Sequence, residues 1–155
     1  MLLKTSYSAR EVAALTGLTA RQLQGWDSGR VFQPAIAPRK TTQGGFTERR
    51  YTPVDVLELL ALAELRRRGF TPLVLKQAMD TLRDCFRRRL SETLDDAGEL
   101  RLFTDGQRLF LRTRQGHIFD LLADPTQPLV TGDGLPMTRV TGREKKRKAR
   151  KAREV

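Results

Sequence analysis

The apolar residues near the start of the chain recur with the spacing of two short helices separated by a turn. In SAREVAALTGLTARQLQGWDSG, residues 8–29, Ser8 stands at a helix N-cap and Glu11 at the position that completes a capping box. The Thr-Gly step that follows ends this helix, because glycine accepts the left-handed backbone of a helix C-terminus. Thr19 then caps a second helix that runs to about Asp27. Two short helices joined by a short turn containing glycine predict a helix-turn-helix.

The next segment, residues 30–51, loses this periodicity and predicts a hairpin, which we call the wing. It contains two prolines, two adjacent glycines and five basic residues. Runs that favour β-structure stand near its two ends, at Val31-Phe32 and Arg50-Tyr51, so we expect a hairpin with a long, basic, flexible tip.

Helical periodicity returns after the wing. Thr52-Pro53 opens a third helix, which ends in a basic run at residues 66–68, and Thr71-Pro72 opens a fourth. The fourth helix has an apolar stripe with nearly the spacing of a coiled-coil seam, formed by Leu75, Met79, Leu82, Phe86 and Leu90. This stripe has two interpretations. It contacts the preceding helices of the same chain, or it forms a helical contact between two copies of the chain. The stripe also includes Cys85, which we predict to be a buried structural thiol.

Alternating apolar and polar residues from 99 to 124 predict a small antiparallel β-meander. Asp105-Gly106 lies between two alternating runs and favours a two-residue type I′ turn, which pairs Leu102 with Leu109 on an apolar face. A turn at Gln115-Gly116 leads into a third strand.

The predicted fold class is therefore mainly α with small β, in several units. We expect a winged helix-turn-helix domain, a linker, the β-meander, a coil rich in proline and glycine, and a basic disordered tail, at residues 1–90, 91–98, 99–124, 125–142 and 143–155.

The charge of the chain is concentrated at its two ends. The net charge is +11, with 16 basic and 8 acidic residues in 1–90, 5 and 8 in 91–142, and 8 and 2 in 143–155. A basic front half and a very basic tail favour a polyanionic partner. The alternative is that these charges only keep the chain soluble.

The order of helix-turn-helix, basic wing, helix, glycine and helix resembles the DNA-binding domain of the MerR (mercury-resistance regulator) family. The similar segments are SAREVAALTGLTARQLQGWDSG and RRYTPVDVLELLALAELRRRGFTPLVLKQAM, within about residues 7–82. The resemblance implies that the second helix lies in the major groove, while the wing and the third and fourth helices contact phosphates. Where the family usually has Arg then Tyr in the second helix, this chain has Gln24 and Gly25.

By position, the resemblance places Thr19, Arg21 and Gln22 near the bases or flanking backbone, and Arg49 and Tyr51 on an Arg-x-Tyr phosphate clamp. These residue types also suit base edges, since Arg pairs with guanine, Gln with adenine and Thr with the thymine methyl. The alternative is a solvated helix face. The full predicted DNA-binding set is Thr19, Arg21, Gln22, Gln24, Arg39, Lys40, Arg49, Arg50 and Tyr51.

The sequence contains few residues suited to catalysis or metal binding. It has one histidine and one cysteine, which leaves neither a thiolate cluster nor a catalytic His pair within one chain. We therefore expect no enzyme activity, no cofactor and no metal. No apolar run approaches the roughly 20 residues of a membrane span, so a cytoplasmic, nucleoid-associated protein without a membrane partner is expected.

Together these observations predict a sequence-specific transcriptional regulator that binds double-stranded DNA and lacks a metal-sensing half. The expected partners are DNA, a second copy of the chain and the transcription machinery, and the β-meander would supply protein contact or dimer support. One alternative is an excisionase-like architectural or recombination accessory protein. Another is a protein-interaction module that binds nucleic acid only loosely.

Overall fold

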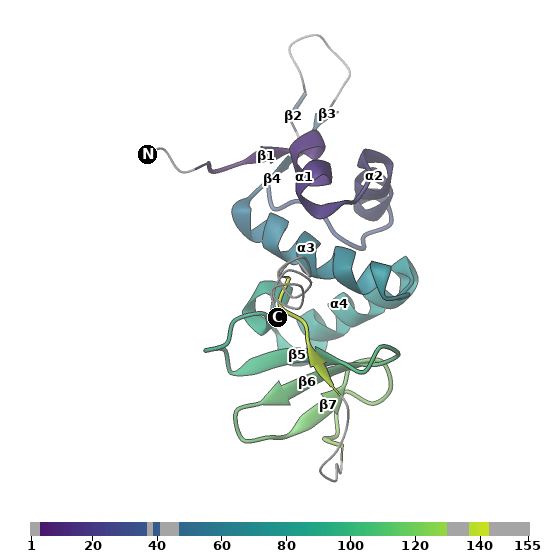
Figure 1. Ribbon diagram of the computed structural model, residues 1–155, viewed down its shortest axis with the longest axis vertical. Helices are drawn as coiled ribbons and strands as arrows, with labels where there is room; N and C mark the ends of the chain where they lie inside the picture. The colour runs from purple at the N-terminus through teal and green to yellow at the C-terminus, as the bar shows by residue number, and fades with distance from the viewer. Residues whose placement is uncertain (1–3, 37–38, 41–46, 130–136, 143–155) are drawn as a thin grey trace, which may run out of the picture.

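The computed structural model describes residues 4–36, 39–40, 47–129 and 137–142. The predicted wing tip and basic tail lie outside these residues. In Figure 1 the first two helices form one end of the molecule, two longer helices cross its middle, and a β-sheet forms the other end. The elements are β1 (Tyr7–Ser8), α1 (Ala9–Thr16), α2 (Ala20–Ser28), β2 (Arg39–Lys40), β3 (Thr47–Glu48), β4 (Arg50–Tyr51), α3 (Pro53–Arg67), α4 (Pro72–Phe86), η1 (Leu90–Thr93), β5 (Leu100–Thr104), β6 (Leu109–Thr113), β7 (Ile118–Asp120) and β8 (Thr138–Arg139).

The helix boundaries follow from local capping chemistry. Ser8, Thr19 and Thr52 each accept a backbone N–H from the third residue of their helix, and the side chain of that residue accepts the cap's own N–H. Thr71 caps α4 through its hydroxyl alone. Gly17 ends α1 at a φ of 79°. The predicted helix-turn-helix and the predicted starts of the third and fourth helices are thereby confirmed.

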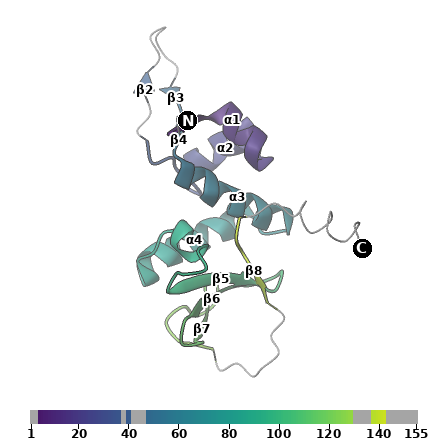
Figure 2. The same ribbon diagram turned by 60° about the vertical axis from the view of Figure 1, so that its left-hand side comes forward.

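The hydrophobic core surrounds α3, which lies between the helix-turn-helix and the sheet (Figure 2). Leu75 and Leu82 of α4 are also fully buried within the chain, and the ring of Phe86 meets that of Phe119 edge-on, with centroids 5.4 Å apart. The apolar stripe of α4 therefore makes core contacts. The helix ends at Phe86, and Leu90 belongs to η1.

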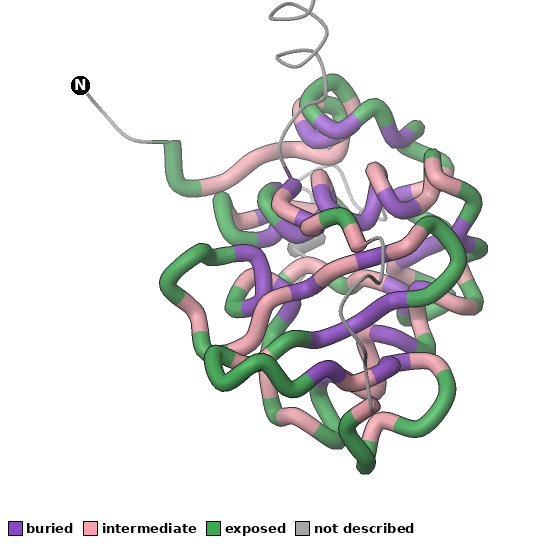
Figure 3. The backbone as a smooth tube through the Cα atoms, turned by 60° about the horizontal axis from the view of Figure 1, so that its bottom comes forward, coloured by how far each residue is buried: buried purple, intermediate pink, exposed green. Residues whose placement is uncertain are grey.

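Cys85 is exposed, which corrects the prediction of a buried thiol. It lies in the last turn of α4, where Phe86 makes the contact with the sheet. The exposed and buried positions along the chain are mapped in Figure 3.

The predicted β-hairpin forms, but with a different turn. Leu102 lies opposite Leu111, and Leu109 lies opposite Thr104, so the register differs from the predicted one by two residues. The Asp105 carboxylate accepts the N–H groups of Gln107 and Arg108, which stabilises a four-residue turn instead of a two-residue one. A shift of two residues keeps every side chain on its predicted face, because the strand period is two.

Two segments predicted to be irregular are parts of the packed fold. Residues 138–139 form β8, which pairs with β5 and completes a four-stranded sheet in the order β7-β6-β5-β8, so the coil prediction for 125–142 is wrong there. The predicted linker at 91–98 overlaps η1, whose Leu90 and Thr93 are buried. Of the helices in the described ranges, none is long and apolar enough to cross a membrane.

Candidate nucleic-acid interface

The second helix of the helix-turn-helix has one buried and one exposed side. Leu23 and Trp26, three residues apart, are 2% and 4% exposed and anchor α2 in the core. Arg21, Gln24 and Ser28 are exposed at the spacing i, i+3, i+7, which places them along one stripe of the helix. Neither the Arg21 nor the Gln24 side chain makes a hydrogen bond with any residue that the structure describes.

Two of the predicted recognition residues, Thr19 and Gln22, form hydrogen bonds that stabilise the start of α2. The Gln22 N–H donates to Thr19 Oγ1 over 3.0 Å, and the Gln22 Oε1 accepts the Thr19 N–H over 2.9 Å. Both side-chain oxygens are thus engaged in the capping box, while the Gln22 amide nitrogen keeps its donor capacity. A substitution at either position therefore disturbs the helix as well as any contact with DNA.

The strands of the wing pair differently from the prediction. Arg39–Lys40 pairs with Thr47–Glu48, and Arg50–Tyr51 pairs with Tyr7–Ser8 at the start of the chain. Val31 and Phe32 form no strand, because their N–H groups both donate to the Trp26 carbonyl and complete the end of α2. The predicted pairing of the two ends of the wing is therefore wrong.

The base of the wing is linked to α2 by an ion pair. Arg49 Nε lies 2.7 Å from Asp27 Oδ2, and both side chains are less than a third exposed. Arg50 is held by Glu48 at 3.1 Å and by the Ser6 hydroxyl at 2.7 Å. These contacts fix the Arg49 guanidinium group close to the C-terminal end of α2 and the Arg50 guanidinium group beside the start of β1, with part of each group open to solvent.

Tyr51 lies in the core, with 1% of its surface exposed. Burial raises the pKa of its hydroxyl, partly countered by Arg49, while Asp27 and Asp55 add to the rise. The side chain therefore presents almost no surface to a ligand. The predicted set therefore divides into exposed residues on α2, capping residues, arginines of the wing base and one buried tyrosine, while the side chains of Arg39 and Lys40 lie outside the description.

An ionic cluster that the sequence analysis missed holds the wing against the rest of the fold. Asp55 and Glu58 of α3 are 0% and 2% exposed, and Arg89 lies 2.8 Å from Asp55 and 2.6 Å from Glu58. Asp55 also accepts the Ala35 N–H at the start of the wing over 3.1 Å. We call Asp55, Glu58 and Arg89 the acid–arginine cluster. Asp55 could be recognised as a capping residue, but nothing local marks its pairing with a residue 34 positions later.

The basic run at the end of α3 also has a structural role. Arg67 donates to the Thr16 carbonyl at the end of α1 over 3.2 Å, and Arg68 forms an ion pair with Glu64 at 3.1 Å. Arg67 thereby satisfies a carbonyl that the end of α1 leaves without a helical partner. The run joins α3 to the helix-turn-helix.

On this surface, α2 is anchored in the core, and its exposed Arg21 and Gln24 side chains make no hydrogen bond with the described residues. Arginine and glutamine side chains of this kind can donate and accept hydrogen bonds at base edges in a major groove. The partly exposed Arg49 and Arg50 are suited to phosphate oxygens. Among the described residues there is no group of three or more His, Cys, Asp or Glu side chains that could hold a metal ion.

Comparison with known protein families matches residues 7–82 to the family described as MerR HTH family regulatory protein. The resemblance predicted from the sequence is thereby confirmed over the same residues. The matched segment begins at β1 and ends within α4, so it includes the helix-turn-helix and the wing but leaves out the four-stranded sheet. No curated protein matches the chain.

Proposed function

The chain belongs, through residues 7–82, to the family of MerR helix-turn-helix regulatory proteins, and we propose that it is a transcriptional regulator that binds double-stranded DNA in a sequence-specific manner. The observation that carries the proposal is the exposed stripe of α2, where Arg21 and Gln24 make no hydrogen bond with the described residues. In this proposal α2 enters the major groove, and these two side chains contact base edges.

The way α2 is held supports this role. Its N-terminal end is fixed by the Thr19–Gln22 capping box and its C-terminal end by the Asp27–Arg49 ion pair. Base recognition requires side chains whose positions are set by the scaffold, because a bidentate contact has strict geometry. Arg49 and Arg50, together with Arg39 and Lys40 of the wing, supply phosphate contacts in the proposal, while Thr19 and Gln22 orient the helix.

Other properties follow from the same proposal. The protein acts by binding and not by catalysis, in the cytoplasm and on nucleoid DNA. It works as a homodimer, in which each copy binds one half-site of the DNA. The dimer also contacts the transcription machinery. The four-stranded sheet stands in place of a metal-sensing half and contributes protein contacts.

A test of the proposal is selection of bound fragments from random duplex DNA at about physiological salt, where weak phosphate binding is suppressed. The wild type is compared with Arg21→Ala/Gln24→Ala, which leaves the capping box intact. Arg112→Ala/Gln115→Ala is the matched control, because it removes the same residue types and charge from exposed positions in and beside the sheet. We expect the wild type and the control to enrich one motif and the α2 variant to lose it.

The outcomes separate the possible functions. An inverted repeat in the enriched fragments supports a dimeric regulator, whereas tandem direct repeats with cooperative binding support the excisionase-like alternative. Enrichment of the same motif by the α2 variant contradicts the recognition role of Arg21 and Gln24. If no protein enriches a motif, sequence-specific binding itself is refuted.

A further inference from the structure

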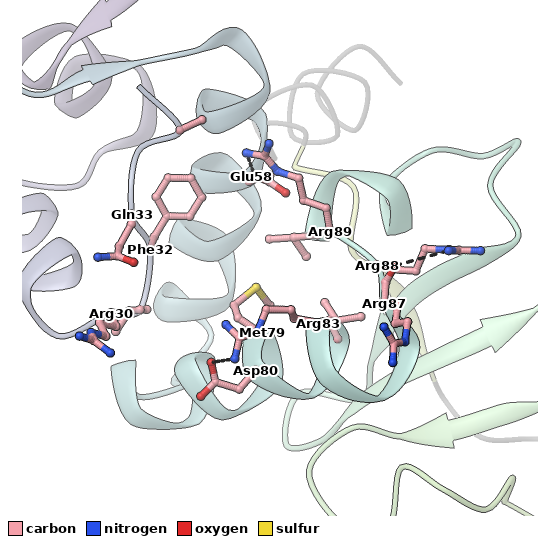
Figure 4. Close-up of a pocket in the computed structure, with 14 residues that line it drawn as sticks. Arg30, Phe32, Gln33, Glu58, Met79, Asp80, Arg83, Arg87, Arg88 and Arg89 are labelled. Atoms are coloured by element: carbon pink, nitrogen blue, oxygen red, sulfur yellow. Dashed lines mark hydrogen bonds and ion pairs between the residues drawn. The ribbon is translucent and has the colours of Figure 1, made fainter. Parts of the chain in front are cut away.

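A groove separates the segment after α2 from α4 and the residues that follow it. Its volume is about 640 Å³, within the range of roughly 300–1,000 Å³ that is typical of ligand sites. Apolar side chains cover much of its wall, and Phe32 and Met79 project into it from opposite sides (Figure 4). The apolar lining residues are Val31, Phe32, Ala35, Met79, Leu82 and Leu90.

Five arginines surround this groove, which contains only two acidic residues, Glu58 and Asp80. Arg83, Arg88 and Arg89 are all neutralised by ion pairs with Asp or Glu side chains. The side chains of Arg30 and Arg87, in contrast, form no ion pair with any residue in the described ranges. These two lie at opposite ends of the groove in Figure 4. The groove therefore carries positive charge that the described part of the protein does not balance.

Arg30 and Arg87 share an unusual backbone. They are the two residues other than glycine with positive φ in the described part of the chain, at 59° and 52°. Arg30 follows the end of α2 and Arg87 follows the end of α4, where glycine is the residue that adopts this conformation without strain. A cation near a helix C-terminus can complement its dipole, but an arginine in the preceding turn would do so without a left-handed backbone. Strained positions of this kind are concentrated at functional sites.

We propose that this groove binds a small organic anion, with an apolar, aromatic body between Phe32 and Met79 and a carboxylate, sulfonate or phosphate group that is attracted by the unbalanced charges of Arg30 and Arg87 at the two ends of the groove. The apolar wall favours such a body, and the two unpaired guanidinium groups favour the anionic group. The chain's own tail does not suit the groove, because residues 143–155 contain 8 basic and only 2 acidic residues. The site is separate from the exposed stripe of α2, so it is an addition to the proposed DNA binding.

The proposal is tested by fluorescence titration of the full chain with 8-anilinonaphthalene-1-sulfonate, which joins an aromatic body to an anion. Arg30→Gly and Arg87→Gly remove the guanidinium groups while keeping a residue that adopts positive φ. Arg112→Gln removes the same charge from an exposed position on β6. We expect saturable binding of one probe per chain, weakened in each glycine variant, weakened about tenfold or more when the two substitutions are combined, and unchanged in the control.

Two further measurements test whether the groove recognises the anionic group of the ligand. N-Phenyl-1-naphthylamine has the same aromatic body without the sulfonate, and we expect it to bind more weakly than the sulfonate by a similar factor. Equal binding of the two probes, or unchanged sulfonate binding in both glycine variants, would overturn the proposal. It is also overturned if the glycine variants weaken binding to random duplex DNA while leaving the probe unaffected, because Arg30 and Arg87 would then be phosphate contacts. Loss of motif selection by the α2 variant affects none of these outcomes.

Discussion

Replacing Arg89 by methionine should remove the ion pairs that join the wing, α3 and the start of η1. Arg89 is the only cation that contacts the Asp55 and Glu58 carboxylates among the described residues, with Nη2 2.8 Å from Asp55 and 2.6 Å from Glu58, and Nε 2.8 Å from Glu58. The remaining donors to these two carboxylates are backbone N–H groups, those of Ala35 and Thr52 at Asp55 and of Ser91 at Glu58. The variant therefore leaves two buried negative charges without a counter-charge.

The expected loss of stability can be estimated from this geometry. Removing one partner of a buried ion pair costs about 3–5 kcal/mol, because the other charge stays desolvated. The Arg89 side chain is 44% exposed, so water reaches one side of the cluster and the cost should lie near the lower limit. We expect Arg89→Met to lower the free energy of unfolding by about 3 kcal/mol, a large part of the roughly 5–15 kcal/mol of a typical domain.

The assay is urea denaturation followed by the fluorescence of Trp26, which is buried in the helix-turn-helix. Arg88→Met is the matched control, because the neighbouring arginine forms ion pairs with Glu92 and Glu99 that lie at the surface. It should cost less than about 1 kcal/mol. Adding Glu58→Gln to Arg89→Met should recover part of the loss, since it removes one unbalanced charge. A loss below about 1 kcal/mol for Arg89→Met would refute the assigned role of the cluster.

Four further predictions concern single residues. Arg87→Gly should raise the free energy of unfolding by about 0.5–1 kcal/mol in the same denaturation assay, because it relieves the left-handed backbone at φ 52°, and a loss of stability would contradict this. Gly25→Ala should also stabilise the protein by about 0.5–1 kcal/mol, since a Cβ there meets nothing within 4 Å, and an unchanged or lowered unfolding midpoint would refute that account. Thr19→Ala should cost about 1 kcal/mol by removing the cap of α2, whereas Thr19→Ser should restore most of it. For Asp105, burial alone would raise the pKa of the carboxyl, but hydrogen bonds from the Gln107 and Arg108 N–H groups and the Arg108 side chain outweigh it and lower the pKa. Its stabilisation is therefore present above the unfolded-state pKa of about 3.9 and lost as the pH falls through the lower folded-state pKa, so the stability difference between wild type and Asp105→Asn should shrink below about pH 4.

Features set by neighbouring residues could be predicted well. Ser8, Thr19, Thr52 and Thr71 begin their helices as expected, because an N-cap needs only a hydroxyl and the N–H groups of the next turn. The faces of the β-hairpin were predicted for a similar reason, since alternation determines which side chains share a face. Its register was not, because the Asp105 side chain stabilises a longer turn than the Asp-Gly pattern favours.

Features that depend on distant residues could not be predicted. β8 is only two residues long, which is too short for an alternation of apolar and polar residues to indicate a strand. It belongs to the sheet because it pairs with β5, more than 30 positions earlier in the chain. Arg50–Tyr51 pairs with the start of the chain instead of with Val31-Phe32, because the latter completes α2. The same limit applies to the candidate site. Arg21 and Gln24 follow from helical spacing, whereas the Asp27–Arg49 ion pair joins residues 22 positions apart.

The segment between α2 and the wing connects the regions on which both proposals depend. Val31 and Phe32 complete the end of α2 through the Trp26 carbonyl, and Ala35 donates to Asp55 in the acid–arginine cluster. Arg30, Val31, Phe32 and Ala35 also line the groove. A ligand that draws Arg30 towards Arg87 would therefore act on a segment bonded both to α2 and to the cluster. If both proposals hold, we expect the probe to alter DNA affinity in the wild type but not in Arg30→Gly, because the segment that it contacts is hydrogen-bonded to the end of α2.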